Sequence, residues 1–270
     1  MVRRPTSSLT RREDGKADLG AATSDRLQIA AQVFAGSSAS LLETLPVGHP
    51  TAVLDLGCGP GHSTKLLAER FTSAEVTGVD VSAGYLADAA MLVPTARFVR
   101  HDVTTMPLPR APLELVYGRM VLAELDRPVE LVESWASQLV ERGWLVLEDL
   151  EWVRADDPAF LSYLELAATT LRAQGRELYA GQLLAAMAPP RGTAVVRAAV
   201  STVTPTAAQS AAMFMLDLAA RREQVLSRGL RTEQELDEVE AALAPFLRDT
   251  RRSVVTWGVR QMALRRWGGR

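Results

Sequence analysis

The chain has 270 residues, of which 47% are hydrophobic and 23% charged, and its formal net charge is −2. This length and apolar content can supply the core of one large α/β domain, and the charge gives no electrostatic reason to expect nucleic acid as a partner. No run of eighteen apolar residues occurs, and no apolar stretch follows the basic N-terminus MVRRPTSSLTRREDG. We therefore expect neither a membrane span nor a signal peptide, and a cytoplasmic location.

Cysteine and histidine are scarce in this sequence. Cys58 is the only cysteine, which excludes a disulfide within the chain. The three histidines, His49, His62 and His101, have no metal-ligand spacing, so we expect no metal site.

The N-terminal region divides into two parts. Residues 1–20 are polar and basic without periodicity, which is typical of a disordered tail. Ser24 or Asp25 can cap a helix that runs to about Leu45, and Gly36-Ser-Ser predicts a break within it.

The most informative stretch is TAVLDLGCGPGHST, residues 51–64. Ala52 to Leu56 reads as a buried strand, and glycines follow at 57, 59 and 61 before a helix begins near His62. Glycines so closely spaced let the backbone turn sharply and approach a ligand. The helix N-terminus offers free N–H groups to an anionic end of that ligand. The dinucleotide pattern G-x-G-x-x-G does not fit, because its third glycine would fall on His62.

The segment Asp55-Leu-Gly57-Cys-Gly59-Pro-Gly61 resembles the first motif of the class I S-adenosylmethionine (SAM) methyltransferases, E/D-x-G-x-G-x-G. The resemblance implies SAM as the cofactor, bound by Asp55 and the three glycines. It also implies a three-layer, Rossmann-like α/β fold with a seven-stranded sheet whose last hairpin is antiparallel. The alternative is a strand-to-helix turn that uses glycine only for its geometry.

Two acids after later strands extend the predicted cofactor site. Glu75 to Val79 predicts a second strand, and Asp80 follows it nineteen residues after Gly61. At that position a carboxylate can accept hydrogen bonds from both ribose hydroxyls of an adenosine.

A third strand, residues 96–100, leads into Asp102 and Val103. The resemblance implies that Asp102 faces the adenine amino group and that the Val103 N–H meets a ring nitrogen. Val81 and Arg119 complete the set of expected cofactor contacts.

The candidate catalytic residues are Glu124, Glu151 and His62. Residues 113–117 predict a fourth strand, and Glu124 follows where similar methyltransferases commonly carry a histidine. A glutamate there can act as a base or line the methionine end of SAM; the alternative is a charged residue facing water. The predicted fifth strand, residues 144–147, is followed by three acids at 148, 149 and 151. At the carboxyl end of a strand these acids can position a substrate or accept its proton. The alternative is that they only cap the chain end of the strand and face solvent.

The C-terminal half predicts helices and two more strands. Helices are expected over 158–174, 178–187, 206–228 and 232–244, and strands over 194–203 and 253–264. We therefore divide the chain into a tail over 1–20, a SAM-binding core with its N-terminal helix over 21–155, and lid helices plus the last two strands over 156–270. Met213-Phe214-Met215 can line an apolar pocket, although core packing explains such residues more often.

These features predict a SAM-dependent methyltransferase that acts on oxygen or nitrogen of a small, largely apolar organic or natural-product acceptor. Glu124 is the preferred base. Two alternatives remain: a SAM-binding enzyme of the same fold that catalyses a rearrangement or cyclisation, and a non-catalytic SAM sensor. We expect a monomer or homodimer.

Overall fold

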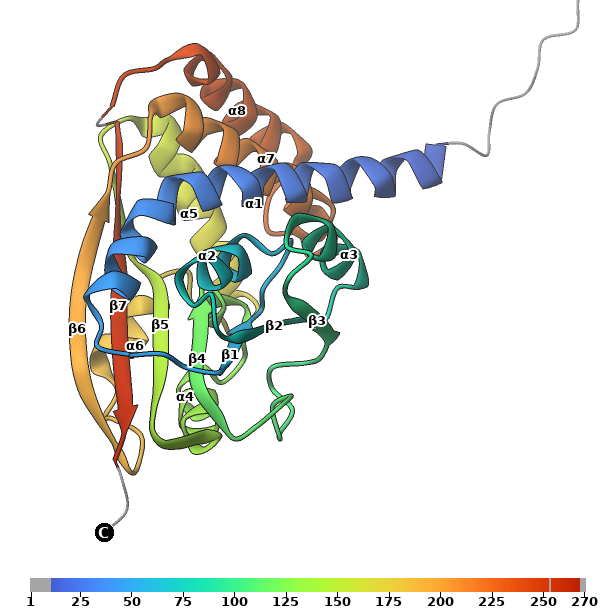
Figure 1. The fold of residues 1–270 in the computed structure, drawn as a ribbon. Helices are drawn as coiled ribbons and strands as arrows, with labels where there is room; N and C mark the ends of the chain where they lie inside the picture. The colour runs from blue at the N-terminus through green and yellow to red at the C-terminus, as the bar shows by residue number, and fades with distance from the viewer. Residues whose placement is uncertain (1–10, 253, 268–270) are drawn as a thin grey trace, which may run out of the picture.

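The computed structural model describes residues 11–252 and 254–267, with side chains from Asp25 onward. In this part of the chain seven strands form one sheet in the order β3-β2-β1-β4-β5-β7-β6 (Figure 1). The strands are β1 Ala52–Leu56, β2 Glu75–Asp80, β3 Arg97–Arg100, β4 Leu113–Arg119, β5 Leu139–Ala155, β6 Thr193–Val203 and β7 Val255–Arg266. β1 to β5 are parallel, and β7 runs antiparallel to both β5 and β6. The expected seven-stranded sheet with an antiparallel last hairpin is confirmed.

Helices cover both faces of the sheet, as expected for parallel strands that are buried on both sides. The α-helices are α1 Arg11–Thr44, α2 His62–Arg70, α3 Ala83–Leu92, α4 Pro128–Ser137, α5 Pro158–Arg172, α6 Gly181–Ala186, α7 Ala207–Ser227 and α8 Glu233–Leu243. Two short 3₁₀ helices are η1 Leu122–Glu124 and η2 Ala244–Arg248. Successive side chains of a strand point to opposite faces of the sheet, so each strand contributes residues to the apolar cores on both faces. Val53 of β1 packs with α1 and α2, whereas Leu54 packs with α4 and α6.

A third apolar cluster lies among α5, α7 and α8 and includes Val255 at the start of β7. Its buried members include Phe160, Phe214 and Leu236, and Ile29 and Val33 of α1 pack against it. Figure 1 shows these helices together beyond one end of the strands, with α1 passing across them. They are the helices that the sequence predicted as a lid.

Helix α6 differs from that expectation because it packs on the sheet. Ala180 and Leu184 belong to the cluster that covers β1, β4 and β5. Gly181 makes the close approach possible, since a Cβ there would lie 2.8 Å from the Leu150 carbonyl oxygen and 2.9 Å from that of Asp149. Of the helices predicted as a lid, α5, α7 and α8 share the third apolar cluster, and the name lid refers below to these three helices alone.

Helix α1 also differs from the expectation. Residues 1–10 of the expected tail lie outside the described residues, but residues 11–20 are helical. They are mostly good helix formers, and helix propensity does not require a hydrophobic period.

The predicted break at Gly36-Ser-Ser is absent within the described helix. Ser38 is buried, and the Ser37 hydroxyl donates to the Ser201 hydroxyl of β6. The small residues are therefore where α1 meets the sheet.

No described helix is long and apolar enough to cross a membrane.

Candidate active site

The glycine loop joins β1 to α2 at the carboxyl ends of the parallel strands. Gly57, Gly59 and Gly61 have φ values of 61°, 52° and 91°, in the left-handed region that residues with a Cβ rarely adopt. A Cβ on Gly57 would lie 2.9 Å from the Cγ2 of Val121, and a Cβ on Gly61 would lie 2.9 Å from the Cβ of Ala89. The loop thus needs glycine both for its turn and for its close neighbours.

Asp55 is the acid inside β1, and it is fully buried. Its Oδ2 accepts hydrogen bonds from the Ser63 hydroxyl at 2.7 Å and the Thr64 hydroxyl at 2.6 Å. Burial raises the pKa of Asp55 to about 6, although both hydrogen bonds act to lower it. Oδ1 is buried and has no hydrogen-bond partner among the described residues. Since buried polar atoms are nearly always paired, this oxygen fits a donor group on a bound ligand.

Asp80 ends β2 beside the glycine loop. Its Oδ2 accepts from the Gly59 N–H at 3.0 Å, and its Oδ1 accepts from the Ser82 N–H at 2.8 Å. These bonds fix the carboxylate, and each oxygen keeps a second acceptor site of the kind that ribose hydroxyls need. Val81, next in the chain, is 58% exposed.

The loop after β3 begins beside Asp80, because the His101 N–H donates to the Asp80 carbonyl. Asp102 is exposed, and its Oδ1 accepts from the N–H and the hydroxyl of Thr104, bonds that lower its pKa. Val103 is buried, and its carbonyl accepts from the Trp135 indole N–H at 2.8 Å. The three strand-end segments expected to bind the cofactor therefore lie side by side on β1, β2 and β3.

The Arg119 guanidinium lies near two groups of the site, Asp55 and His62. Its charge lowers the pKa of Asp55 and also that of His62. Burial is the larger cause for His62, whose pKa falls below its usual range, and the charge of Lys65 adds to the effect. His62 is half-buried at the start of α2 and is neutral at pH 7, so its imidazole can accept a proton.

β5 continues past the three acids at 148, 149 and 151, whereas the sequence analysis predicted that the strand ends before them. It runs from Leu139 to Ala155, so Glu148 and Asp149 are buried inside the sheet. Glu148 accepts from the Tyr117 hydroxyl and the Gln261 amide. These partners come from β4 and β7, so Glu148 has neither the solvated nor the capping role that was one alternative for these acids.

Asp149 supports the segment that follows β4. Its Oδ2 accepts from the Leu122 N–H at 2.9 Å, at the start of η1, and its Oδ1 accepts from its neighbour Leu150. Burial raises the pKa of Asp149 to about 7, and the nearby Glu124 charge acts in the same direction. The sequence analysis treated Asp149 only as one of three strand-end acids and missed this role.

The other two candidate bases are ion-paired. The side chain of Glu124 is 53% exposed; its Oε1 lies 3.2 Å from Arg221 Nη2 and its Oε2 lies 3.5 Å from Arg176 Nη1. Both oxygens of Glu151 accept from Arg260 of β7. Glu151 therefore faces β7, whereas Glu124 belongs to an ion-paired network that extends to the lid.

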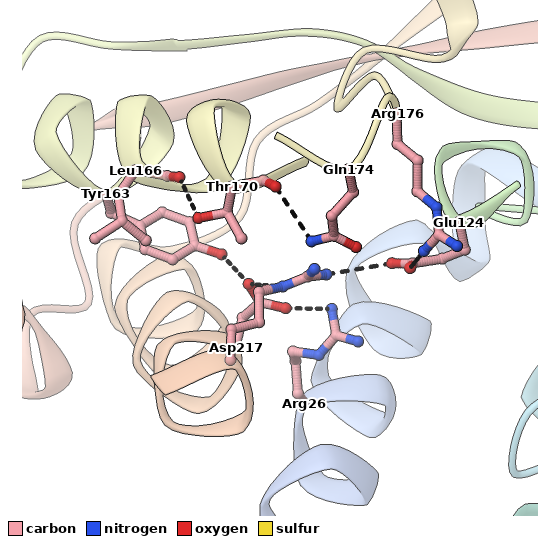
Figure 2. Close-up of polar contacts among 9 residues, drawn as sticks. Arg26, Glu124, Tyr163, Leu166, Thr170, Gln174, Arg176 and Asp217 are labelled. Carbon is pink, nitrogen blue, oxygen red and sulfur yellow. Dashed lines mark hydrogen bonds and ion pairs between the residues drawn. The ribbon is translucent and has the colours of Figure 1, made fainter. Parts of the chain in front are cut away.

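Asp217 of α7 is the centre of that network (Figure 2). Its side chain is 8% exposed and accepts from the Tyr163 hydroxyl at 2.7 Å and from Arg221 Nε at 2.8 Å. Arg26 Nη1 of α1 lies 3.2 Å from its other oxygen. Asp217 thus connects α1, α5 and α7. No short-range sequence motif could reveal this ion-paired network, because Glu124 and Arg221 are 97 residues apart in the chain.

Met213 and Phe214 pack in the lid core. They are 4% and 2% exposed, and the Phe214 ring stacks on Tyr163 with ring centroids 4.1 Å apart. The core-packing alternative therefore holds for both residues. Among the residues with described side chains, no group of three or more His, Cys, Asp and Glu residues is arranged to hold a metal ion.

Comparison with known proteins gives a consistent result. Residues 53–143 match the family model described as a methyltransferase domain. The chain is 37% identical over 111 residues to the trans-aconitate 2-methyltransferase of Methylobacterium nodulans, a match that covers 41% of this chain and 43% of that protein. The chain therefore spans less than half the length of this curated relative.

Solved structures share the fold at low sequence identity. The YcgJ protein of Bacillus subtilis matches 87% of this chain and 100% of its own, with a TM-score of 0.53 and 16% identity. The plantazolicin methyltransferase in complex with S-adenosylhomocysteine (SAH) matches 97% of this chain and 92% of its own, with a TM-score of 0.51 and 14% identity. Taken with the glycine loop and the strand order, the match over residues 53–143 identifies a class I methyltransferase domain in this chain.

Proposed function

We propose that this chain is a SAM-dependent methyltransferase that transfers a methyl group to oxygen or nitrogen of a small organic acceptor. One observation carries the proposal: the segment that matches the methyltransferase domain contains the left-handed glycine loop, the orphaned Asp55 oxygen and Asp80. All three lie at the carboxyl ends of neighbouring strands, where open α/β sheets bind their ligands. The curated relatives at 35–38% identity are named as methyltransferases, which does not favour a rearrangement, a cyclisation or a sensor role.

We assign the cofactor contacts as follows. Asp80 accepts from the ribose hydroxyls, with Val81 beside it. Asp102 and the Val103 N–H recognise the adenine. The glycine loop admits the methionine part, whose ammonium group suits the unpaired Oδ1 of Asp55 and whose carboxylate suits the Arg119 guanidinium. The list of residues is the one expected from the sequence.

The protein groups then have three tasks in the reaction. SAM supplies an electron-poor methyl carbon on a sulfonium, which the acceptor attacks in line. The strand ends and the lid orient the two reactants and exclude water. Where the acceptor must lose a proton, we propose His62 as its base, because the pKa of His62 is lowered and the imidazole is neutral. Glu124 and Glu151 are weaker candidates, because arginines already hold both of their carboxylate oxygens.

The acceptor of the curated relatives is not transferred to this chain, because the match covers less than half of either protein. The expectation of a largely apolar acceptor also rested on lid residues, of which Met213 and Phe214 pack in the lid core. We therefore propose only a small organic molecule at this stage. The cytoplasmic location, the monomeric or dimeric state and the absence of a nucleic-acid partner stay predictions.

Calorimetry with SAM, SAH and NAD tests the cofactor assignment. We expect SAM and SAH to bind with dissociation constants of micromolar order, roughly −8 kcal/mol, and NAD not to bind. A screen of small organic acceptors with methyl-labelled SAM then tests the reaction, since a methyltransferase releases SAH in proportion to methylated product. NAD binding without SAM binding would refute the proposal, and so would SAM binding without SAH release across the acceptor screen.

A further inference from the structure

We propose that Arg221 and Arg176, with Arg26 beside them, bind a carboxylate group of the methyl acceptor, and that Glu124 takes the place of that carboxylate in the structure. The inference rests on the proposed function and adds a substrate class to it: the acceptor is an acid. None of the three arginines belongs to the expected cofactor contacts.

Residues adjacent in sequence to the two ends of the arginine network contact the glycine loop. A Cβ on Gly59 would lie 3.8 Å from the Cδ1 of Leu27, the residue that follows Arg26 in α1. On the other flank Val121 lies over Gly57, and η1, which ends in Glu124, begins at the next residue. The ion-paired series from Arg26 through Asp217 and Arg221 to Glu124 connects these two flanks. A molecule bound there lies next to the methionine side of the proposed cofactor site.

Asp217 holds Arg221 in one orientation. The side chain of Arg221 is 18% exposed, and its Nε is bonded to Asp217, which the Tyr163 hydroxyl also contacts. With Nε fixed, Nη2 is directed to the carboxylate of Glu124. A guanidinium held in this way is a preorganised receptor for a planar carboxylate.

Glu124 is held more loosely than Asp217. Its two arginine contacts measure 3.2 and 3.5 Å, against 2.8 Å between Arg221 Nε and Asp217. Half of its side chain is exposed, and exposed ion pairs contribute little to stability. Figure 2 shows Glu124 beside Arg176, at the outer end of the network. A carboxylate from outside can therefore replace Glu124 at a small cost.

One further observation points to a missing acceptor of hydrogen bonds. The Nε of Arg26 is buried, and no described residue accepts a hydrogen bond from it. The network itself is charge-balanced, because three guanidinium groups face the carboxylates of Asp217, Glu124 and Asp126. Glu124 and Asp126 are 53% and 79% exposed, so water competes for both of these carboxylates.

Calorimetry on the SAH-saturated full chain tests the inference without knowledge of the natural acceptor. The probes are trans-aconitate, benzoate and octanoate, each compared with its own methyl ester. We expect at least one acid to bind about tenfold more tightly than its ester. Arg176→Gln and Arg221→Gln should weaken that binding by about tenfold or more. Glu124→Gln should strengthen it by about threefold, because the competing carboxylate is removed.

Two arginines serve as matched controls that should leave acid binding unchanged. Arg222 is the next residue of α7 but pairs with Glu233, Asp237 and Glu240 of α8. Arg127 is 77% exposed and pairs with Glu130. Both are changed to Gln. If Arg221→Gln fails to fold because Asp217 loses its partner, Arg176→Gln and Glu124→Gln still decide the result.

The possible failures are distinguishable. If SAH binds but no acid binds more tightly than its ester, the inference is wrong and the proposed function stands. The inference is equally wrong if an acid binds and neither Arg176→Gln nor Glu124→Gln changes its affinity. If SAH itself does not bind, the proposed function fails and the inference with it.

Discussion

Asp80 provides the sharpest test of the cofactor site, because the structure gives both of its oxygens a fixed position. They accept from the N–H groups of Gly59 and Ser82 and keep further acceptor sites for a ligand. Asp80→Ala removes both carboxylate oxygens, and with them the two hydrogen bonds and the acceptor sites for a ligand. It leaves the N–H groups of Gly59 and Ser82 without this acceptor.

The expected loss of affinity follows from the hydrogen bonds that disappear. A hydrogen bond to a charged group contributes about 1.5–3 kcal/mol, so losing the ribose contacts should weaken SAH binding by about 2 kcal/mol or more. That corresponds to a factor of about 30 in the dissociation constant. The fold should survive, since Asp80 is not part of the buried core.

A truncated ligand separates the roles of the two acids. Methylthioadenosine keeps the ribose and lacks the amino-acid end of SAH. Asp80→Ala should therefore weaken both ligands equally, whereas Asp55→Asn, which changes the proposed partner of the ammonium group, should weaken SAH alone. Glu69→Ala, a change of an exposed carboxylate on α2, is the control. If SAH binds the folded Asp80→Ala variant within about threefold of the wild-type constant, far below that expected loss, Asp80 has no part in the site.

The remaining predictions concern proton transfer, pH and packing. His62→Ala should lower turnover by about 10²–10⁴ and leave SAH affinity nearly unchanged; turnover within tenfold of wild type would remove His62 as the base. Asp149 keeps its proton up to about pH 7 when folded, whereas its usual pKa is 3.8, so this group makes the protein less stable as pH rises between those values. Urea unfolding at pH 5 and pH 7.5 should show that Asp149→Asn loses part of this dependence, on the order of 3 kcal/mol, and identical pH profiles would contradict the assignment. Phe214→Ala should lower the free energy of unfolding by about 3–5 kcal/mol, because the ring is buried against Tyr163 and Phe160; a small loss in denaturant titrations would mean that Phe214 lines a cavity instead.

The parts of the site that the sequence predicted correctly are local. Asp55, the glycines and the helix that follows lie within one strand-loop-helix unit, and their spacing alone restricts the backbone. Asp80 could be located because the acid ends an apolar strand at a known distance from the glycines. The seven-stranded sheet and its antiparallel last hairpin came from the resemblance that these motifs supported.

The parts that were missed depend on contacts between distant segments. An acid inside a strand reads as the end of that strand unless its partners are known, and Glu148 has its partners on β4 and β7. Glu124 reads as a surface residue or a base for the same reason, since Arg221 is 97 residues further along the chain. Composition and periodicity describe neighbours in sequence, so neither could reveal a charge network formed by four separate elements.

The lid core contacts the sheet at β5 and β7 and contains no described residue of β1 or β2, which has a consequence for how such a protein can diversify. Phe160, Phe214 and Leu236 stabilise the lid without belonging to either cluster that contains β1 and β2. Substitutions among the lid helices can therefore accumulate without disturbing the strands that carry the glycine loop. An ancestral chain could change its lid while the segment that matches the methyltransferase domain stayed recognisable. Sequence similarity to relatives that covers only 41% of this chain is the pattern such a history leaves.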